Sequence, residues 1–211
     1  MCPCGGDRTK RHNLLRNRVY HFASSAGLNP ELEKAGLLQP RPLIGASPEE
    51  GIRQANPDAR RPADVYLPRW RRGTAVALDF AVTSGLSNIR AMLNGASSAV
   101  TTYKDFKRSH LDTERLCQEE GFAFIPIVAE ACGGCWGTSA LKVFHEPAKT
   151  KSLLTGESTD LLQTQLLQNL GTTLHRENAR AVVKRMFPAR GVPTLCSTQL
   201  ARCRPPVPKL T

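Results

Sequence analysis

The sequence predicts an α/β fold, a small mixed sheet of three to four strands flanked by helices. Two strand-like runs, residues 63–67 and 74–82, are joined by a loop typical of a β-hairpin, and a third apolar run spans 122–128. Helical periodicity precedes and follows these runs. The chain has 211 residues, 40% of them hydrophobic, which is enough for one domain with a single core.

Apolar residues at three- and four-residue spacing mark the helices. They predict a basic helix over 8–26, a helix over 89–109, and further helices over 139–149 and 158–187. A short helix is also expected at 31–34. Pro126 interrupts the third strand-like run and therefore predicts an edge strand or a bulge.

These patterns divide the chain into five segments. We expect a basic N-terminal helix in 1–27, a connector in 28–60, the core in 61–150, a long C-terminal helix in 151–187 and a disordered basic tail in 188–211. A further helix start is expected within the connector, at Pro48-Glu49-Glu50.

The charge of the chain is concentrated at its two ends. The net charge is +11, and residues 1–72 carry 13 basic and 7 acidic side chains, 73–187 carry 12 and 11, and 188–211 carry 4 and none. Such flanks are typical of nucleic-acid binding, because Lys and Arg neutralise phosphates. A basic surface that only improves solubility is the alternative interpretation.

Composition also constrains the compartment. No window approaches the length of apolar sequence that a membrane span needs, and the first residues do not resemble a secretory signal. The seven cysteines are odd in number and irregularly spaced. We therefore expect an intracellular protein with reduced thiols and no membrane partner.

Two acidic residues are embedded in the predicted hairpin. Asp64 and Asp79 lie on strands that the hairpin would pair, so both carboxylates could reach one Mg²⁺ ion. Lys107 falls on the apolar side of the predicted 89–109 helix, facing the sheet. It could stabilise charge on a phosphodiester, or it could simply extend past the end of the helix into solvent.

The densest basic run surrounds the hairpin. Arginines interleaved with Tyr66 and Trp70 suit phosphate contact with base stacking. The arginines expected to bind nucleic acid here are Arg60, Arg61, Arg69, Arg71 and Arg72.

Cysteine and histidine patterns give weaker indications of metal or redox sites. Cys132 and Cys135 have Cys-x-x-Cys spacing, but we favour a glycine turn with two incidental thiols, because one pair makes no complete zinc site. A local zinc site that combines Cys2 and Cys4 with His12 and His21 is not expected, because the two histidines lie on opposite sides of one helix.

Three segments together resemble a known family. They are residues 61–65 (RPADV), 77–82 (ALDFAV) and 103–107 (YKDFK). They look like the restriction-like PD-(D/E)XK endonuclease domain of non-LTR retrotransposon proteins. Upstream, Cys4 followed by Arg11-His12-Asn13 is similar to the end of that family's zinc knuckle and the motif after it.

The resemblance implies a restriction-endonuclease-like fold and Mg²⁺- or Mn²⁺-dependent cleavage of DNA, with RNA as a second partner. Asp64 and Asp79 would be the metal-binding catalytic acids, and Lys107, or as second choice Lys104, the catalytic lysine. Ala81 stands where the simplest motif has its lysine, so that lysine would have migrated to the next helix.

The resemblance also implies a nucleic-acid-binding role for Arg11, His12 and Asn13. Segment 1–27 would hold a remnant of the zinc knuckle, without zinc. The chain would belong to a longer reverse transcriptase polyprotein and would act in the nucleus of a eukaryotic cell. Two alternatives are a nucleic-acid-binding module without catalysis and a decayed retroelement fragment.

Overall fold

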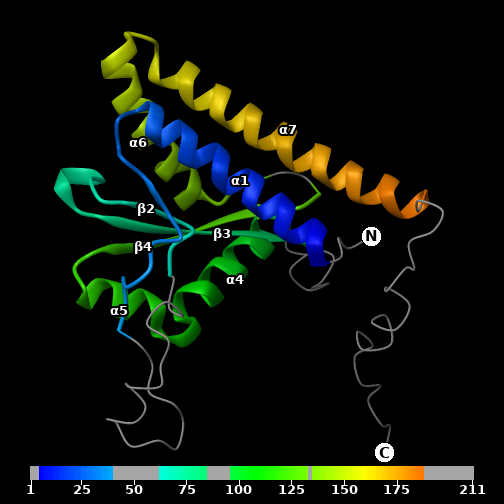
Figure 1. The fold of residues 1–211 in the computed structure, drawn as a ribbon, viewed down its shortest axis with the longest axis horizontal. Helices are drawn as coiled ribbons and strands as arrows, with labels where there is room; N and C mark the ends of the chain where they lie inside the picture. Colours follow the sequence, from blue (N-terminus) through cyan, green and yellow to red (C-terminus); the bar gives the residue numbers. More distant parts are fainter. Residues whose placement is uncertain (1–4, 40–61, 85–95, 133–134, 188–211) are drawn as a thin grey trace, which may run out of the picture.

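The computed structural model describes residues 5–39, 62–84, 96–132 and 135–187. Within them, a mixed sheet of four strands lies between two layers of helices (Figure 1). The predicted α/β fold is therefore confirmed. None of the described helices is both long enough and apolar enough to cross a membrane.

The strands lie across the sheet in chain order. They are β1 (Glu31–Leu32), β2 (Val65–Leu67), β3 (Val76–Thr83) and β4 (Ala123–Glu130). The first two pairings are antiparallel, which confirms the hairpin of β2 and β3, and β3 pairs with β4 in parallel. Strand β4 is one of the two edge strands, as Pro126 predicts, because proline has no N–H to donate to a further strand.

Helices cover both faces of the sheet. On one face lie α1 (Gly5–Ser25), α6 (Thr138–Thr155) and α7 (Thr159–Met186), and on the other α4 (Ala96–Ser109) and α5 (Thr113–Glu119) (Figure 1). Short 3₁₀ turns lie at Arg71–Gly73, between β2 and β3, and at His110–Asp112, between α4 and α5. The sheet is therefore covered on both faces.

Strand β3 is the central element that positions the acidic residues. Leu78 and Phe80 are buried in the main core, together with residues of α1, α6 and α7. Ala77 belongs to a second cluster on the opposite face, with Phe124. Because side chains alternate along a strand, Asp79 lies on the same face as Ala77, beneath α4.

The structure corrects one sequence expectation and leaves others outside the described residues. Residues 31–34 do not form a helix, because Glu31 and Leu32 pair with β2 and Glu33 has a positive φ of 45°. The first part of the predicted 89–109 helix, the expected helix start at residue 48 and the predicted tail 188–211 lie outside the described residues. The proposed boundary at residue 150 falls inside α6.

Ile127 tests the location of the main core. Its side chain is 0% exposed, and it pairs with Phe80 in the register of β3 and β4. We expect Ile127→Val to lower the free energy of unfolding by about 0.5–1.5 kcal/mol, because a buried methylene is lost. Leu153→Ala is the control, since Leu153 is 81% exposed. If chemical denaturation shows equal losses of unfolding free energy for the two variants, the location of the core at Ile127 is contradicted.

Candidate active site

Asp64 lies where the pairing of β2 with β3 ends. Its backbone N–H donates to the carbonyl of Leu78 at 2.9 Å, and its Oδ2 accepts a hydrogen bond from the N–H of Phe80 at 2.6 Å. The carboxylate of Asp64 thus accepts the hydrogen bond that a backbone carbonyl would accept from the Phe80 N–H if β2 were longer. This contact fixes Asp64 beside the middle of β3.

Asp79 forms an ion pair with Lys107 across the α4 face of the sheet. The Nζ of Lys107 lies 2.9 Å from Oδ2 and 3.3 Å from Oδ1 of Asp79. Burial raises the pKa of Asp79 above its ordinary value, and the charge of Asp64 raises it further, although Lys107 and His12 act in the opposite direction. The site therefore holds a carboxylate at a cost in free energy.

Lys107 remains a cation in this environment. Burial lowers its pKa, but the charge of Asp79 and the hydrogen bond to it more than offset that effect, so the pKa lies above its ordinary value. Its side chain is 26% exposed, so the ammonium lies at the site and does not extend fully into solvent. A lysine in this state can stabilise an anion, and it is a poor proton acceptor.

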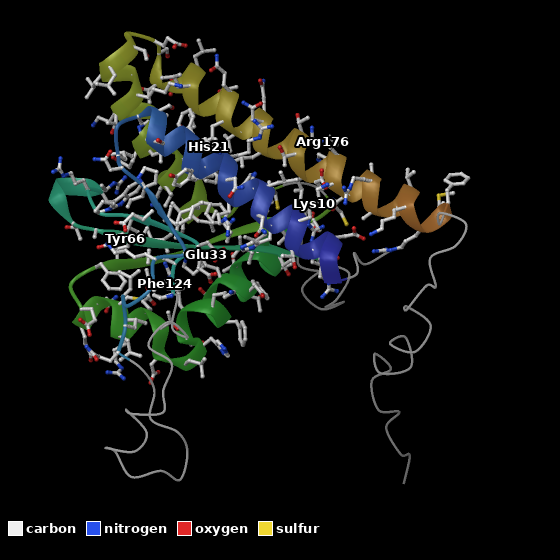
Figure 2. All side chains as sticks on the ribbon, in the orientation of Figure 1. Lys10, His21, Glu33, Tyr66, Phe124 and Arg176 are labelled. Carbon is white, nitrogen blue, oxygen red and sulfur yellow. The ribbon has the colours of Figure 1, made fainter. Side chains whose placement is uncertain are left out.

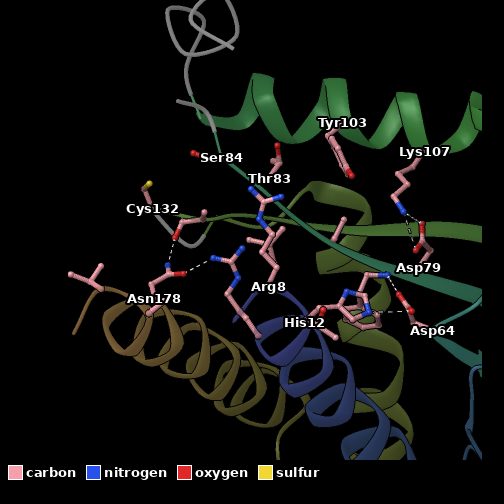
Figure 3. A pocket seen from close by; sticks show the side chains of 18 of the residues that line it. Arg8, His12, Asp64, Asp79, Thr83, Ser84, Tyr103, Lys107, Cys132 and Asn178 are labelled. Atoms are coloured by element: carbon pink, nitrogen blue, oxygen red, sulfur yellow. Dashed lines mark hydrogen bonds and ion pairs between the residues drawn. The ribbon is translucent and has the colours of Figure 1, made fainter. Parts of the chain in front are cut away.

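His12 joins the site from helix α1. Its Nε2 lies 3.2 Å from Oδ1 of Asp64, and both side chains are only partly exposed. Figure 3 shows Lys107 and Tyr103 reaching down from α4, while His12 approaches Asp64 from the opposite side. Helix α1, the residue just before β2, strand β3 and helix α4 thus all contribute to one group of side chains.

These side chains line a cavity of about 1030 Å³ at the C-terminal half of β3. Its basic lining residues are Arg8, Arg11, Lys107 and Arg185, and its acidic ones are Asp64 and Asp79. Helices α1 and α7 form one wall, and Tyr103 of α4 lies across from them (Figure 3). The cavity therefore combines two carboxylates with an excess of cations.

Arg11 connects the two helices of that wall. It is buried, and its Nη1 donates to Oδ1 of Asn178 on α7 at 2.5 Å. Asn178 in turn donates to the carbonyl of Ala131, just after β4, at 2.7 Å. Arg11 thus positions α1 against α7 and the end of the sheet. The neighbouring Asn13 is half-buried and does not line the cavity.

The hairpin arginines lie away from the cavity. Arg69 and Arg71 belong to the β2–β3 connection, which is at the opposite end of β3 from Thr83. Arg71 donates to Glu146 of α6. Residue Arg72 lies in the same 3₁₀ turn, and residues 60 and 61 lie outside the described residues. The structure therefore does not bring Arg69 or Arg71 to the acidic pair.

Lys104 also lies apart from the acidic pair. Its Nζ is 4.0 Å from Oδ1 of its neighbour Asp105, and it is not among the residues that line the cavity. Of the two candidate lysines, only Lys107 contacts Asp79. The two lysines are only one helical turn apart on α4, but their different contacts distinguish Lys107 from Lys104.

The cysteine motif lies near the far end of the cavity. Cys132 lines it with an exposed thiol, and its backbone N–H donates to the buried carboxylate of Glu130 at 2.8 Å. Burial raises the pKa of the Cys135 thiol, and the charge of Glu130 adds to the effect. Residues 2 and 4 and the two glycines between Cys132 and Cys135 lie outside the described residues.

The donor set at the acidic pair fits Mg²⁺ better than zinc. No three His, Cys, Asp or Glu side chains form a complete metal-binding group within the described part of the chain. Mg²⁺ does not need one, because it retains waters and binds one or two carboxylates together with substrate phosphates. Asp64 and Asp79 lie close enough to repel each other, and a divalent cation would relieve that repulsion.

Sequence reasoning missed the wall formed by α7. Asn178 contacts Arg11, a residue 167 positions away, and no local pattern indicates such a pair. Arg8 and Arg185 also line the cavity, although they lie near the two ends of the described chain. Their clustering depends on the packing of α1 against α7.

Comparison with known proteins adds no family to this geometry. No protein-family model matches the chain, and no curated protein matches it.

Proposed function

We propose that this chain is a Mg²⁺-dependent DNA endonuclease of the restriction-like kind found in non-LTR retrotransposon proteins. The observation that carries the proposal is the ion pair of Lys107 with Asp79, 2.9 Å long, which lies beside Asp64 in a cavity rich in arginine. Carboxylates for a metal and a cation for a phosphate are the two requirements of phosphodiester hydrolysis. The DNA of a eukaryotic nucleus would be its substrate.

Asp64 and Asp79 would hold the metal ion, which supplies charge neutralisation at the phosphate and makes water more acidic. The Phe80 N–H and His12 hold the two oxygens of Asp64 in place. Such contacts fix the carboxylate before the metal binds, so that little ordering remains to be done at that moment. Asp79 is oriented in the same way by both of its contacts with Lys107.

Lys107 would act on the substrate as a cation. Its raised pKa keeps the ammonium charged at neutral pH. A positive charge fixed beside the scissile phosphate stabilises the negative charge that develops on its oxygens in the transition state. With its pKa raised, Lys107 would not serve as the general base, so water must lose its proton to another acceptor, such as solvent or the substrate itself.

The cleavage proposal is tested by nicking of supercoiled plasmid. We expect the full chain to nick in Mg²⁺ or Mn²⁺ and not in EDTA. Asp64→Asn should raise the Mg²⁺ concentration for half-maximal nicking by about 10–100-fold, because a charged metal ligand is replaced by a neutral one. Lys142→Ala is the matched control, since Lys142 is exposed on α6 and does not line the cavity.

The alternative functions give different results in the same assay. A binding module without catalysis would retain salt-sensitive DNA binding and show no nicking in Mg²⁺ or Mn²⁺ above the level in EDTA, and Asp64→Asn would not weaken that binding. A decayed fragment would melt without cooperativity. Metal-independent nicking would contradict the proposed use of the two carboxylates.

A further inference from the structure

Three of the four basic side chains near the end of α7 have acidic partners. Arg176 lies 3.7 Å from Glu177, and Arg180 lies 3.3 Å from the same glutamate. Arg180 and Lys184 also lie 3.7 and 3.5 Å from Asp7 of α1. The charges of Arg180 and Lys184 therefore contribute to the packing of α1 against α7, while that of Arg176 is paired within α7. They are not directed to the cavity.

Arg185 is the fourth, and its environment differs. It lines the cavity that contains Asp79 and Lys107. Its Nη2 is buried and has no hydrogen-bond partner among the described residues. A buried guanidinium N–H without an acceptor is costly, so this arrangement is expected mainly where a ligand supplies the acceptor.

The surroundings of Arg185 indicate the charge of that ligand. Arg8 lines the same cavity from α1, and the excess of cations there favours an anion. A guanidinium matches the oxygens of a phosphate with two parallel N–H groups, which a lysine cannot do. Since Lys107 already has Asp79 as its partner, Arg185 provides a second and separate point of contact for an anionic chain.

We propose that Arg185 binds a backbone phosphate of the DNA strand, one other than the phosphate that is cleaved. This inference rests on the proposed function in one respect, because it takes the cavity to be where DNA binds. Arg185 would hold the strand in register while Asp79 and Lys107 act on it. The contact carries no sequence information, so it should strengthen binding to all DNA sequences alike.

The test is DNA binding by the full chain in EDTA, where metal-dependent cleavage is blocked. A fluorescein-labelled 20 base-pair duplex is titrated by fluorescence anisotropy at several salt concentrations. We expect Arg185→Gln to raise Kd about tenfold and to reduce the slope of log K against log salt by about 0.9, the value for one lost phosphate contact. Arg185→Lys should restore the slope and only part of the affinity.

The matched control is Arg176→Gln. Arg176 lies on the same helix and points away from the sheet (Figure 2), and its replacement by glutamine removes the same charge as Arg185→Gln does. Its slope should equal that of the wild type. Equal slopes for Arg185→Gln and Arg176→Gln would overturn the inference, as would a wild type that shows no salt-dependent binding. Circular dichroism establishes that each variant is folded.

The two proposals fail in different ways. If the wild type nicks plasmid but Arg185→Gln binds as the wild type does, the phosphate contact is overturned and the nuclease stands. If Arg185→Gln reduces the slope of log K against log salt as expected but the wild type never nicks, the phosphate contact stands and the nuclease is overturned.

Discussion

Asp79→Asn is expected to reduce plasmid cleavage by about 10³-fold, which corresponds to roughly 4 kcal/mol of transition-state stabilisation. The same variant should be more stable than the wild type at pH 7. Burial raises the pKa of Asp79 in the folded protein, even with Lys107 beside it. The fold thus favours the neutral form of residue 79, and asparagine imitates that form.

The pH dependence of stability gives this prediction a second readout. The folded-state pKa of Asp79 lies above the unfolded value of about 3.9, so the folded state holds the proton more tightly. The stability that Asp79 contributes is fully present below the unfolded pKa and is lost as pH rises through the folded pKa. Asp79→Asn should lack this loss.

Chemical denaturation of both proteins between pH 4 and pH 8 measures the difference. We expect the two curves to separate as pH rises, with the variant above the wild type at pH 7. A variant that is both inactive and less stable at pH 7 would indicate that Asp79 serves mainly to hold α4 on the sheet. Mg²⁺ should stabilise the wild type and leave the variant nearly unchanged, since the ion binds the charged carboxylate.

Lys107→Met is expected to lower the cleavage rate by about 10²–10³-fold, as the loss of one fixed donor to a developing oxyanion does elsewhere. Methionine keeps much of the length of the side chain without its charge. Lys104→Met is the matched comparison, because Lys104 lies one turn away on the same helix and pairs with Asp105, not with Asp79. Its rate should stay within about twofold of the wild type.

The pH–rate profile of Lys107→Met shows whether the loss of the lysine's charge, and not only the change in side-chain shape, causes the lower rate. The charge of Lys107 and its hydrogen bond lower the pKa of Asp79, so removing Lys107 should raise that pKa further. The acidic limb of the profile for Lys107→Met should therefore move to higher pH. Equal rates for Lys107→Met and Lys104→Met would contradict the assignment of the catalytic lysine.

The sequence predicted the elements that depend on local pattern. The lengths of the two strand-like runs and the loop between them predict the hairpin, and helical phase directs Lys107 to the sheet. Pro126 marks an edge strand, since it lacks an N–H. In each case the signal lies within a short window, where side-chain period or backbone chemistry determines the outcome.

Features that depend on distant partners could not be predicted. Arg71 lies in a basic run that suggests nucleic acid, yet it pairs with Glu146, 75 positions away. The pairing of β1 is also non-local, because two residues form a strand only when β2 lies beside them. The clustering of arginines along the sequence therefore did not indicate which arginines line the cavity.

The packing of α1 against α7 determines when the cavity can exist. Arg11 and Asn178 lie 167 positions apart, so the wall they form requires α7 to have been synthesised and folded. When the residues of the sheet and of α4 have been synthesised, the side of the cavity that contains Arg185 is still missing. A growing chain would thus carry its two carboxylates before it can bind a strand, and the wall that holds Arg185 would be the last part of the cavity to form.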